Sequence, residues 1–290
     1  MAEQSAADSL KAVMERGTYL ANNVATCLHC HADRDFTKFA GPVIPGTEGK
    51  GGRQIMPGIY VRNITPYALG DWTDEEIYQV LTTGIRKNGD TLFPIMPYAN
   101  YAKMPREEVY SIIAWLRSLA PIEHNVPARD LTKLPPGILA EAYNKFYIPH
   151  AEKKLSPPPP DDLVARGAYL VNAGDCEGCH SPFDDAIFDF KTDEHLSGGE
   201  HFKPKDFGFE VTSANLTPDT ATGLGGWTEE TFLAKFRHYR DSSGYCYDAG
   251  KYNSIMPWTQ VARMDDEDLK AIYAYLRTVK PVSKRIQKWQ

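Results

Sequence analysis

The sequence predicts a mainly α-helical protein built from two tandem copies of one module. Short motifs of the first half recur in the same order in the second half, and apolar residues in both halves follow helical spacing. A proline-rich stretch separates the copies. We therefore expect a first domain at residues 1–120, a linker at 121–160 and a second domain at 161–290.

The composition is that of a soluble globular protein. Of the 290 residues, 42% are apolar and 24% are charged, and this length allows two domains that each bury a core. The formal charge is −6 and no block of basic residues is present, so nothing favours nucleic acid as a partner. No stretch approaches the roughly 18 apolar residues that span a bilayer, so we expect no transmembrane segment.

The repeat runs through both halves. Its blocks, first copy then second, are Arg16–Leu20 and Arg166–Leu170, Asn63–Pro66 and Asn215–Pro218, Trp72–Thr73 and Trp227–Thr228, Ile95–Tyr98 and Ile255–Trp258, and Trp115–Arg117 and Tyr275–Arg277. The offset between copies grows from 150 at the first arginines to 160 at the methionines Met96 and Met256. The second copy therefore carries net insertions, which we place within 184–220 and 240–253.

The segment between the copies, 121–160, contains nine prolines, four of them at 157–160. Proline lacks an amide hydrogen and holds the preceding residue extended, which excludes a long helix or an inner strand. The final run should form a stiff polyproline II spacer. The segment is either a passive tether or a linker that packs between the domains, and Tyr143, Phe146 and Tyr147 favour packing.

Each copy should contain at least three helices around a long loop rich in glycine and proline. The expected helices are residues 8–23 and 161–173, two helices that begin after Thr73 and Thr228, and the last helices at about 105–119 and 265–279, opened by Pro105 and Asp265. Thr73–Glu76 has the capping-box pattern. Middle loops of this length inside a compact domain normally surround a ligand.

Both copies carry the pattern C-x-x-C-H, which is the attachment signature of c-type haem. The two thiols add to the haem vinyl groups, and the adjacent histidine is then held on one haem face toward the iron. We therefore predict two covalently bound haem c groups. The predicted attachment residues are Cys27, Cys30, Cys176 and Cys179, and the predicted proximal iron ligands are His31 and His180.

Other uses of paired cysteines fit less well. A zinc site would need both pairs brought together, although they lie in separate copies of one repeat. A thioredoxin-type dithiol needs a βαβ context, whereas these pairs follow predicted helices. A disulfide framework would distribute cysteines through a short chain. Two haem sites in register is the better interpretation.

A second axial ligand should come from later in each module. Met96 and Met256 fit best, because each lies in an Ile-Met-Pro segment just before the last helix. Methionine is also a common core residue, and we assign Met56, Met104 and Met264 to packing. A thioether ligand gives a comparatively high potential and closes the iron to oxygen and peroxide. This ligation favours electron exchange over catalysis, so we predict no catalytic residue.

The remaining candidate residues have less specific roles. Cys246 is either an inert thiol or a replacement for Met256 on the iron, which would lower the potential and indicate sulfur chemistry. Trp72 and Trp227 either donate an indole N–H to a haem propionate or pack in the core. The histidines assigned to surface or core roles are His29, His124, His150, His195, His201 and His238.

On these residues, both halves resemble class I cytochrome c domains, particularly those in the cytochrome c subunits of bacterial alcohol and gluconate dehydrogenases. The shared motifs are R-G-x-Y-L, C-x-x-C-H, N-[IL]-T-P, G-x-W-T-[DE]-E, [IM]-M-P-[YW] and A-[WY]-L-R. The resemblance implies His/Met ligation of both haems, with Met96 serving the first and Met256 the second. It also implies electron transfer between a dehydrogenase or quinone and a terminal acceptor. Those subunits usually have three haem modules, whereas two are present here.

Covalent haem attachment implies maturation outside the cytoplasm, so we expect a periplasmic protein. Residues 1–3 lack the basic and apolar regions of a signal peptide, so we expect a mature or trimmed chain.

We predict a dihaem c-type cytochrome that passes single electrons from a dehydrogenase or quinol-linked donor to another cytochrome or a terminal oxidase. Its acidic charge predicts a partner with a basic docking patch. One alternative is an enzyme acting at one haem. A peroxidase-like enzyme needs an open iron, and a thiosulfate dehydrogenase-like enzyme needs a thiolate, for which Cys246 is the spare cysteine. Another is a subunit that never leaves its dehydrogenase, which exposed apolar patches would favour.

Overall fold

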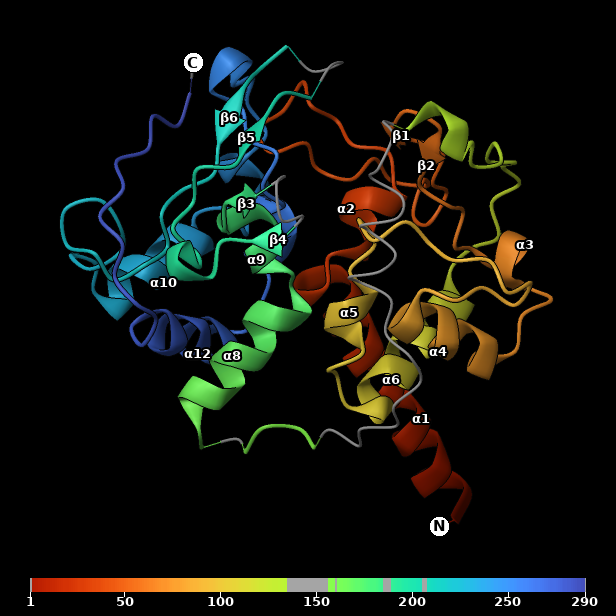
Figure 1. The fold of residues 1–290 in the computed structure, drawn as a ribbon. Coiled ribbons are helices and arrows are strands. Elements are labelled where there is room, and N and C mark those ends of the chain that lie inside the picture. Colours follow the sequence, from red (N-terminus) through yellow and green to blue (C-terminus); the bar gives the residue numbers. More distant parts are fainter. Residues whose placement is uncertain (1, 135–155, 160, 185–188, 205–207, 290) are drawn as a thin grey trace. The chain divides into compact units, whose positions relative to one another are not determined.

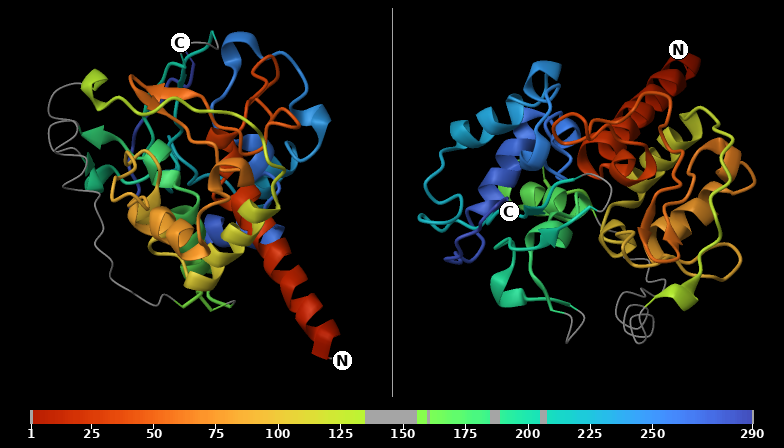
Figure 2. Two further views of the ribbon diagram at one scale, coloured as in Figure 1. Left: turned by 90° about the vertical axis from the view of Figure 1, so that its right-hand side faces the viewer. Right: turned by 90° about the horizontal axis from the view of Figure 1, so that it is seen from above.

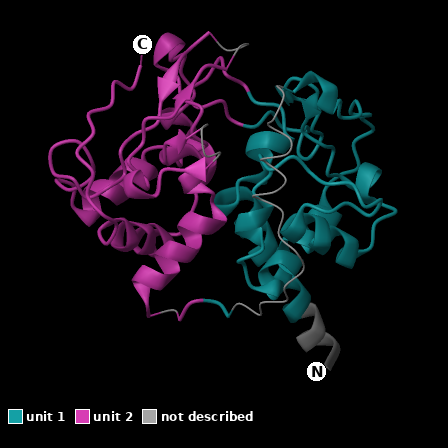
Figure 3. Ribbon diagram, in the orientation of Figure 1, with its two compact units in different colours: residues 1–34, 43–157 teal, residues 35–42, 158–290 magenta. Residues whose placement is uncertain are grey.

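The computed structural model describes residues 2–134, 156–159, 161–184, 189–204 and 208–289. They form two compact units, coloured separately in Figure 3. Unit 1 comprises residues 1–34 and 43–157, and unit 2 comprises residues 35–42 and 158–290. The aromatic residues expected to pack from the linker, Tyr143, Phe146 and Tyr147, lie outside the described residues, as does His150.

Unit 1 is mainly helical, as predicted (Figure 1). Its helices are α1 (Ala2–Tyr19), the π-helical turn η1 (Leu20–Val24), α2 (Cys27–His31), α3 (Pro66–Leu69), α4 (Asp74–Thr83), α5 (Tyr98–Tyr101), α6 (Arg106–Ser118) and the 3-10 turn η2 (Leu131–Lys133). Strands β1 (Gln54–Met56) and β2 (Ile59–Tyr60) form an antiparallel hairpin. The capping box expected at the start of α4 is confirmed, since Thr73 and Glu76 each accept the other's backbone N–H.

Unit 2 repeats the helical plan with longer loops. Its helices are α8 (Leu163–Ala173), α9 (Cys176–His180), η3 (Thr192–Glu194), α10 (Glu229–Arg237), η4 (Ser242–Gly244), η5 (Gly250–Tyr252), α11 (Trp258–Val261) and α12 (Asp266–Leu276). Antiparallel pairs join β3 (Phe183–Asp184) to β4 (Asp189–Phe190) and β5 (His201–Phe202) to β6 (Val211–Thr212). These strands were not predicted, because runs of two residues are too short to show an alternating pattern.

No helix in the described part of the chain combines the length and the apolar character needed to cross a bilayer.

In each unit the first long helix crosses the last long helix at a glycine. α1 packs on α6 in unit 1 and α8 packs on α12 in unit 2 (Figures 1 and 2). A Cβ atom on Gly17 would lie 1.8 Å from the carbonyl oxygen of Ser111, and one on Gly167 would lie 1.9 Å from that of Ala271. The two backbones therefore touch, and the glycine of the R-G-x-Y-L motif is a packing requirement.

The arginine of the same motif forms an ion pair across each crossing. Arg16 reaches Glu108 at 2.6 Å in unit 1, and Arg166 pairs with the buried Asp268 in unit 2. Because the buried Asp268 carboxylate is costly without a partner, its pair with Arg166 fixes how α8 is rotated against α12. The chain continues from α1 in unit 1, and from α8 in unit 2, into the C-x-x-C-H turn. The crossing therefore also positions the start of that turn.

Residues 35–42, which belong to unit 2, are held by the insertion of the second copy. Asn253 is 2% exposed; its Oδ1 accepts the N–H of Ala40 at 2.8 Å, and its Nδ2 donates to the carbonyl of Phe36 at 3.0 Å. Phe39 is buried and stacks on Tyr239, with ring centroids 5.2 Å apart. The insertion at 240–253 thus has a structural role inside unit 2.

We predict that Gly167→Ala destabilises unit 2, because the new methyl group must push apart two helix backbones in contact. The expected loss in the free energy of unfolding is about 1–3 kcal/mol, measured by urea denaturation. Gly226→Ala is the matched control, since a Cβ there has only one neighbour, at 3.8 Å, and the expected change is within about 0.5 kcal/mol. Equal stabilities of the two variants would contradict the close crossing.

Candidate metal centres

Both C-x-x-C-H segments fold into a single helical turn, α2 in unit 1 and α9 in unit 2. The residue before each turn has a left-handed backbone, with φ 45° at Thr26 and φ 48° at Asp175. This conformation costs a residue with a side chain about 1–2 kcal/mol. The same strain at the same place in both units indicates that the turn must present its side chains in one fixed geometry.

His31 and His180 are each 8% exposed and are held in the same way. Nδ1 of His31 lies 2.7 Å from the carbonyl oxygen of Arg62, and Nδ1 of His180 lies 2.8 Å from that of Ala214. A carbonyl only accepts hydrogen bonds, so Nδ1 carries the hydrogen and Nε2 keeps a lone pair. This is the tautomer of a metal-ligating imidazole.

Burial also keeps both imidazoles neutral. Loss of hydration lowers the pKa of His31 to about 4 and lowers the pKa of His180. A neutral ring is the form that binds metal, because a protonated ring has no lone pair. Each site therefore presents an oriented imidazole nitrogen at neutral pH.

Each unit has a Gly-Gly pair, and its first glycine leaves room for the carbonyl that binds the histidine. Gly51 and Gly198 have φ 66° and 67°, and their N–H groups donate to the carbonyl of His31 at 3.1 Å and of His180 at 2.7 Å. A Cβ atom at either glycine would lie 2.4 Å from the carbonyl oxygen that binds the imidazole. No motif pointed to these residues, although the doublet Gly-Gly follows His31 by 20 residues and His180 by 18.

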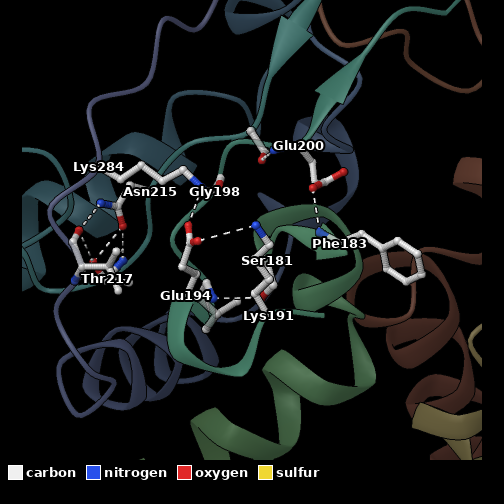
Figure 4. A network of polar contacts seen from close by, with 12 residues as sticks. Ser181, Phe183, Lys191, Glu194, Gly198, Glu200, Asn215, Thr217 and Lys284 are labelled. Atoms are coloured by element: carbon white, nitrogen blue, oxygen red, sulfur yellow. Dashed lines mark hydrogen bonds and ion pairs between the residues drawn. The ribbon is translucent and has the colours of Figure 1, made fainter. Parts of the chain in front are cut away.

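The N-[IL]-T-P motif anchors the same loop (Figure 4). Asn215 directly follows Ala214; its Oδ1 accepts the N–H of Thr217 at 2.9 Å, and its Nδ2 donates to the carbonyl of Val282 at 2.8 Å. The chain that follows the last helix is thereby tied to the imidazole-binding carbonyl. The equivalent bonds in unit 1 join Asn63 to Thr65 at 2.9 Å and to the carbonyl of Ile122 at 2.9 Å.

The two candidate methionine ligands share one backbone conformation. Each is followed by a proline with the dihedrals of an inverse γ-turn, φ −79° and ψ 50° at Pro97 and φ −75° and ψ 54° at Pro257. The N–H two residues after Met96 and Met256 donates to the methionine carbonyl at 2.8 Å in both units. Both methionines are half-buried, whereas Met104 and Met264 are buried.

The donor set fits a covalently bound haem. Burial raises the pKa of Cys27 and of Cys176 to about 12, so these sulfurs are not the low-pKa thiolates of a redox dithiol. The Nε atom of Arg53 is buried and has no hydrogen-bond partner among the described residues. A buried donor without a partner costs about 1–3 kcal/mol, and a haem propionate would satisfy it.

The other residues singled out from the sequence have ordinary surroundings. His29 accepts a hydrogen bond from Arg34 at 2.7 Å, and His195 lies 2.9 Å from Glu177. Cys246 is exposed. The indole rings of Trp72 and Trp227 are half-buried.

The chain is similar in sequence to known cytochrome c proteins. Residues 164–280 match the cytochrome c family model. The chain is 29% identical, over 95% of its length, to the cytochrome c subunit of alcohol dehydrogenase (quinone) from Gluconacetobacter polyoxogenes, and 28% identical, over 96%, to the gluconate 2-dehydrogenase cytochrome c subunit of Pantoea cypripedii. It spans 58% and 62% of the length of those two proteins.

A diheme c-type cytochrome of Cereibacter sphaeroides is 28% identical over 87% of this chain and 81% of its own length. The resemblance to cytochrome c subunits of dehydrogenases, which the sequence motifs predicted, is confirmed.

We predict that Gly51→Ala disrupts the first site, because its Cβ would collide with the carbonyl that holds His31. Gly89→Ala is the matched control: its φ of 80° imposes the same kind of backbone strain, but a Cβ there meets nothing within 4 Å. In urea denaturation, Gly51→Ala should lose about 1–3 kcal/mol more stability than Gly89→Ala. Equal losses would mean that the close approach of the carbonyl does not matter.

Proposed function

We propose that this chain is a dihaem c-type cytochrome that carries single electrons. One observation supports this most strongly. In both units, a backbone carbonyl orients the buried imidazole of the C-x-x-C-H turn. Cys27 and Cys30 would attach the first haem, and Cys176 and Cys179 the second. In this proposal residues 1–120 and 161–290 are tandem cytochrome c domains, and residues 121–160 connect them.

In the proposed sites, His31 and His180 would hold the iron through Nε2, and Met96 and Met256 would supply its second ligands. The haem supplies the one-electron chemistry. The chain orients the imidazole through its carbonyl hydrogen bond, excludes water from it by burial, and offers the Arg53 guanidinium to a propionate. Methionine ligation raises the potential and leaves no open position on the iron, which suits electron transfer rather than catalysis.

The relatives suggest the place of this electron transfer. Two of them are named as cytochrome c subunits of alcohol and gluconate dehydrogenases. We infer that electrons arrive from a dehydrogenase or a quinol-linked donor and leave to another cytochrome or a terminal oxidase in the periplasm. The formal charge of −6 favours partners with basic docking surfaces.

The test is a reductive spectral titration of the purified holoprotein. We expect two haems per chain and a methionine–iron charge-transfer band from each oxidised haem. Met96→His and Met256→His should each remove half of the band, because each replaces one thioether with an imidazole. Met56→Leu is the control and should keep the full band, since Met56 lies in β1 and is assigned to packing.

Each failure has a separate meaning. One haem per chain would contradict the dihaem proposal. A five-coordinate iron or a thiolate spectrum in the wild-type protein would favour an enzyme acting at one haem instead. A full band in either methionine-to-histidine variant would remove that residue from the iron.

A further inference from the structure

We propose that the first haem site has a higher reduction potential than the second, so that electron transfer inside the chain runs downhill from the second site to the first. This inference rests on the proposed function. It comes from one contrast in the structure: the two sites share a backbone, but at one equivalent position the first has a cation and the second an anion.

The sign changes at one equivalent position. Arg53 and Glu200 each follow the glycine pair described above. The carbonyl of Arg53 accepts the N–H of Val61 at 2.9 Å, and the carbonyl of Glu200 accepts the N–H of Ser213 at 2.9 Å. Val61 and Ser213 immediately precede Arg62 and Ala214. The carbonyls of Arg62 and Ala214 bind the two histidines. The two side chains are therefore equivalent in backbone position, and one is a cation where the other is an anion.

Two arginines lie near the first site. Arg53 acts on His31 as a positive charge, and its buried Nε has no hydrogen-bond partner in the described chain. Arg34 lies next to the C-x-x-C-H turn and contacts His29 at 2.7 Å. Burial, and then the charge of Arg53, lowers the pKa of Arg34 to about 9, which leaves the Arg34 guanidinium charged at neutral pH. The nearby Asp33 is paired with Lys50 at 2.6 Å.

The equivalent position in the second site carries an anion. Glu200 accepts the N–H of Phe183, three residues after His180, at 2.8 Å (Figure 4). Asp175 precedes the first cysteine and Glu177 lies between the cysteines, where the first copy has the uncharged Thr26 and Leu28.

Two lysines also lie near the second site. Lys284 is paired with Glu194 at 2.8 Å (Figure 4). Lys288 acts on His180 as a positive charge, although burial and Lys235 lower its own pKa. Glu177 lies 2.9 Å from His195, so the contrast in charge with the first site rests on Glu200.

Charge is the difference between the two sites that the structure shows, and we use it to order the potentials. The proposed axial ligands and the hydrogen bonds to the histidines are the same in both sites. Reduction adds one electron to the haem, so a nearby positive charge stabilises the reduced form and a negative charge destabilises it. At the low effective dielectric of a buried site, a unit charge within several ångströms has a large effect. Cations therefore raise the first potential, and anions lower the second.

The methionine variants measure the two potentials separately. In Met256→His only the first haem keeps a methionine–iron charge-transfer band, and in Met96→His only the second does. Following that band during a potentiometric titration gives the midpoint of one assigned haem. We expect a higher midpoint in Met256→His than in Met96→His; equal or reversed midpoints would overturn the inference. Absence of the band in wild type would instead reject the proposed function.

Charge variants test the cause. Glu200→Gln keeps an oxygen that accepts the N–H of Phe183 and removes the negative charge, so the second midpoint should rise while the first stays. Arg53→Gln should lower the first midpoint only. Glu229→Gln, at an exposed position at the start of α10, is the control and should move neither. A Glu200→Gln midpoint equal to that of the control would overturn the assignment of the difference to these charges.

Discussion

The hydrogen bond between a buried histidine Nδ1 and a backbone carbonyl is the constraint on which each half of this chain depends. It fixes the ring and the tautomer, and it does so with a main-chain group that no side-chain mutation removes. The repeated motifs then have clear purposes. The glycine pair lets the carbonyl approach, the N-[IL]-T-P asparagine ties its loop to the chain after the last helix, and the R-G crossing holds the helix that leads into the turn.

These contacts fix the backbone around each histidine. Buried polar groups such as Asn215 are fully used in joining segments distant in sequence, and an unpaired group at such a place would cost about 1–3 kcal/mol. A rigid site suits a centre whose charge changes by one electron, because a surrounding structure that does not move adds little reorganisation to the transfer. The contacts around each histidine therefore suit the proposed electron transfer.

Much of this could be predicted from the sequence, for identifiable reasons. C-x-x-C-H and the capping box at Thr73 are local patterns, so spacing alone reveals them. The role of Gly51 could not be predicted, because it depends on the approach of a carbonyl eleven residues further along the chain. The equivalence of Arg53 and Glu200 could not be predicted for another reason. Their offset of 147 residues is shorter than the 150 between Arg16 and Arg166, because insertions and deletions separate the two copies. Hydrogen bonds across the loop were needed to align them.

The alignment of positions 53 and 200 shows how two copies of one module can differ in charge and keep the same backbone. The histidine, the carbonyl and the glycines are locked together by contact distances, so a change at any of them damages the site. The side chains at positions 53 and 200 extend from the same loop without forming that contact, and their charge is free to differ. Two copies with the same ligands and the same charges would give an electron no preferred direction. Opposite charges around a shared backbone give the chain a direction while the imidazole hydrogen bond stays unchanged in both halves.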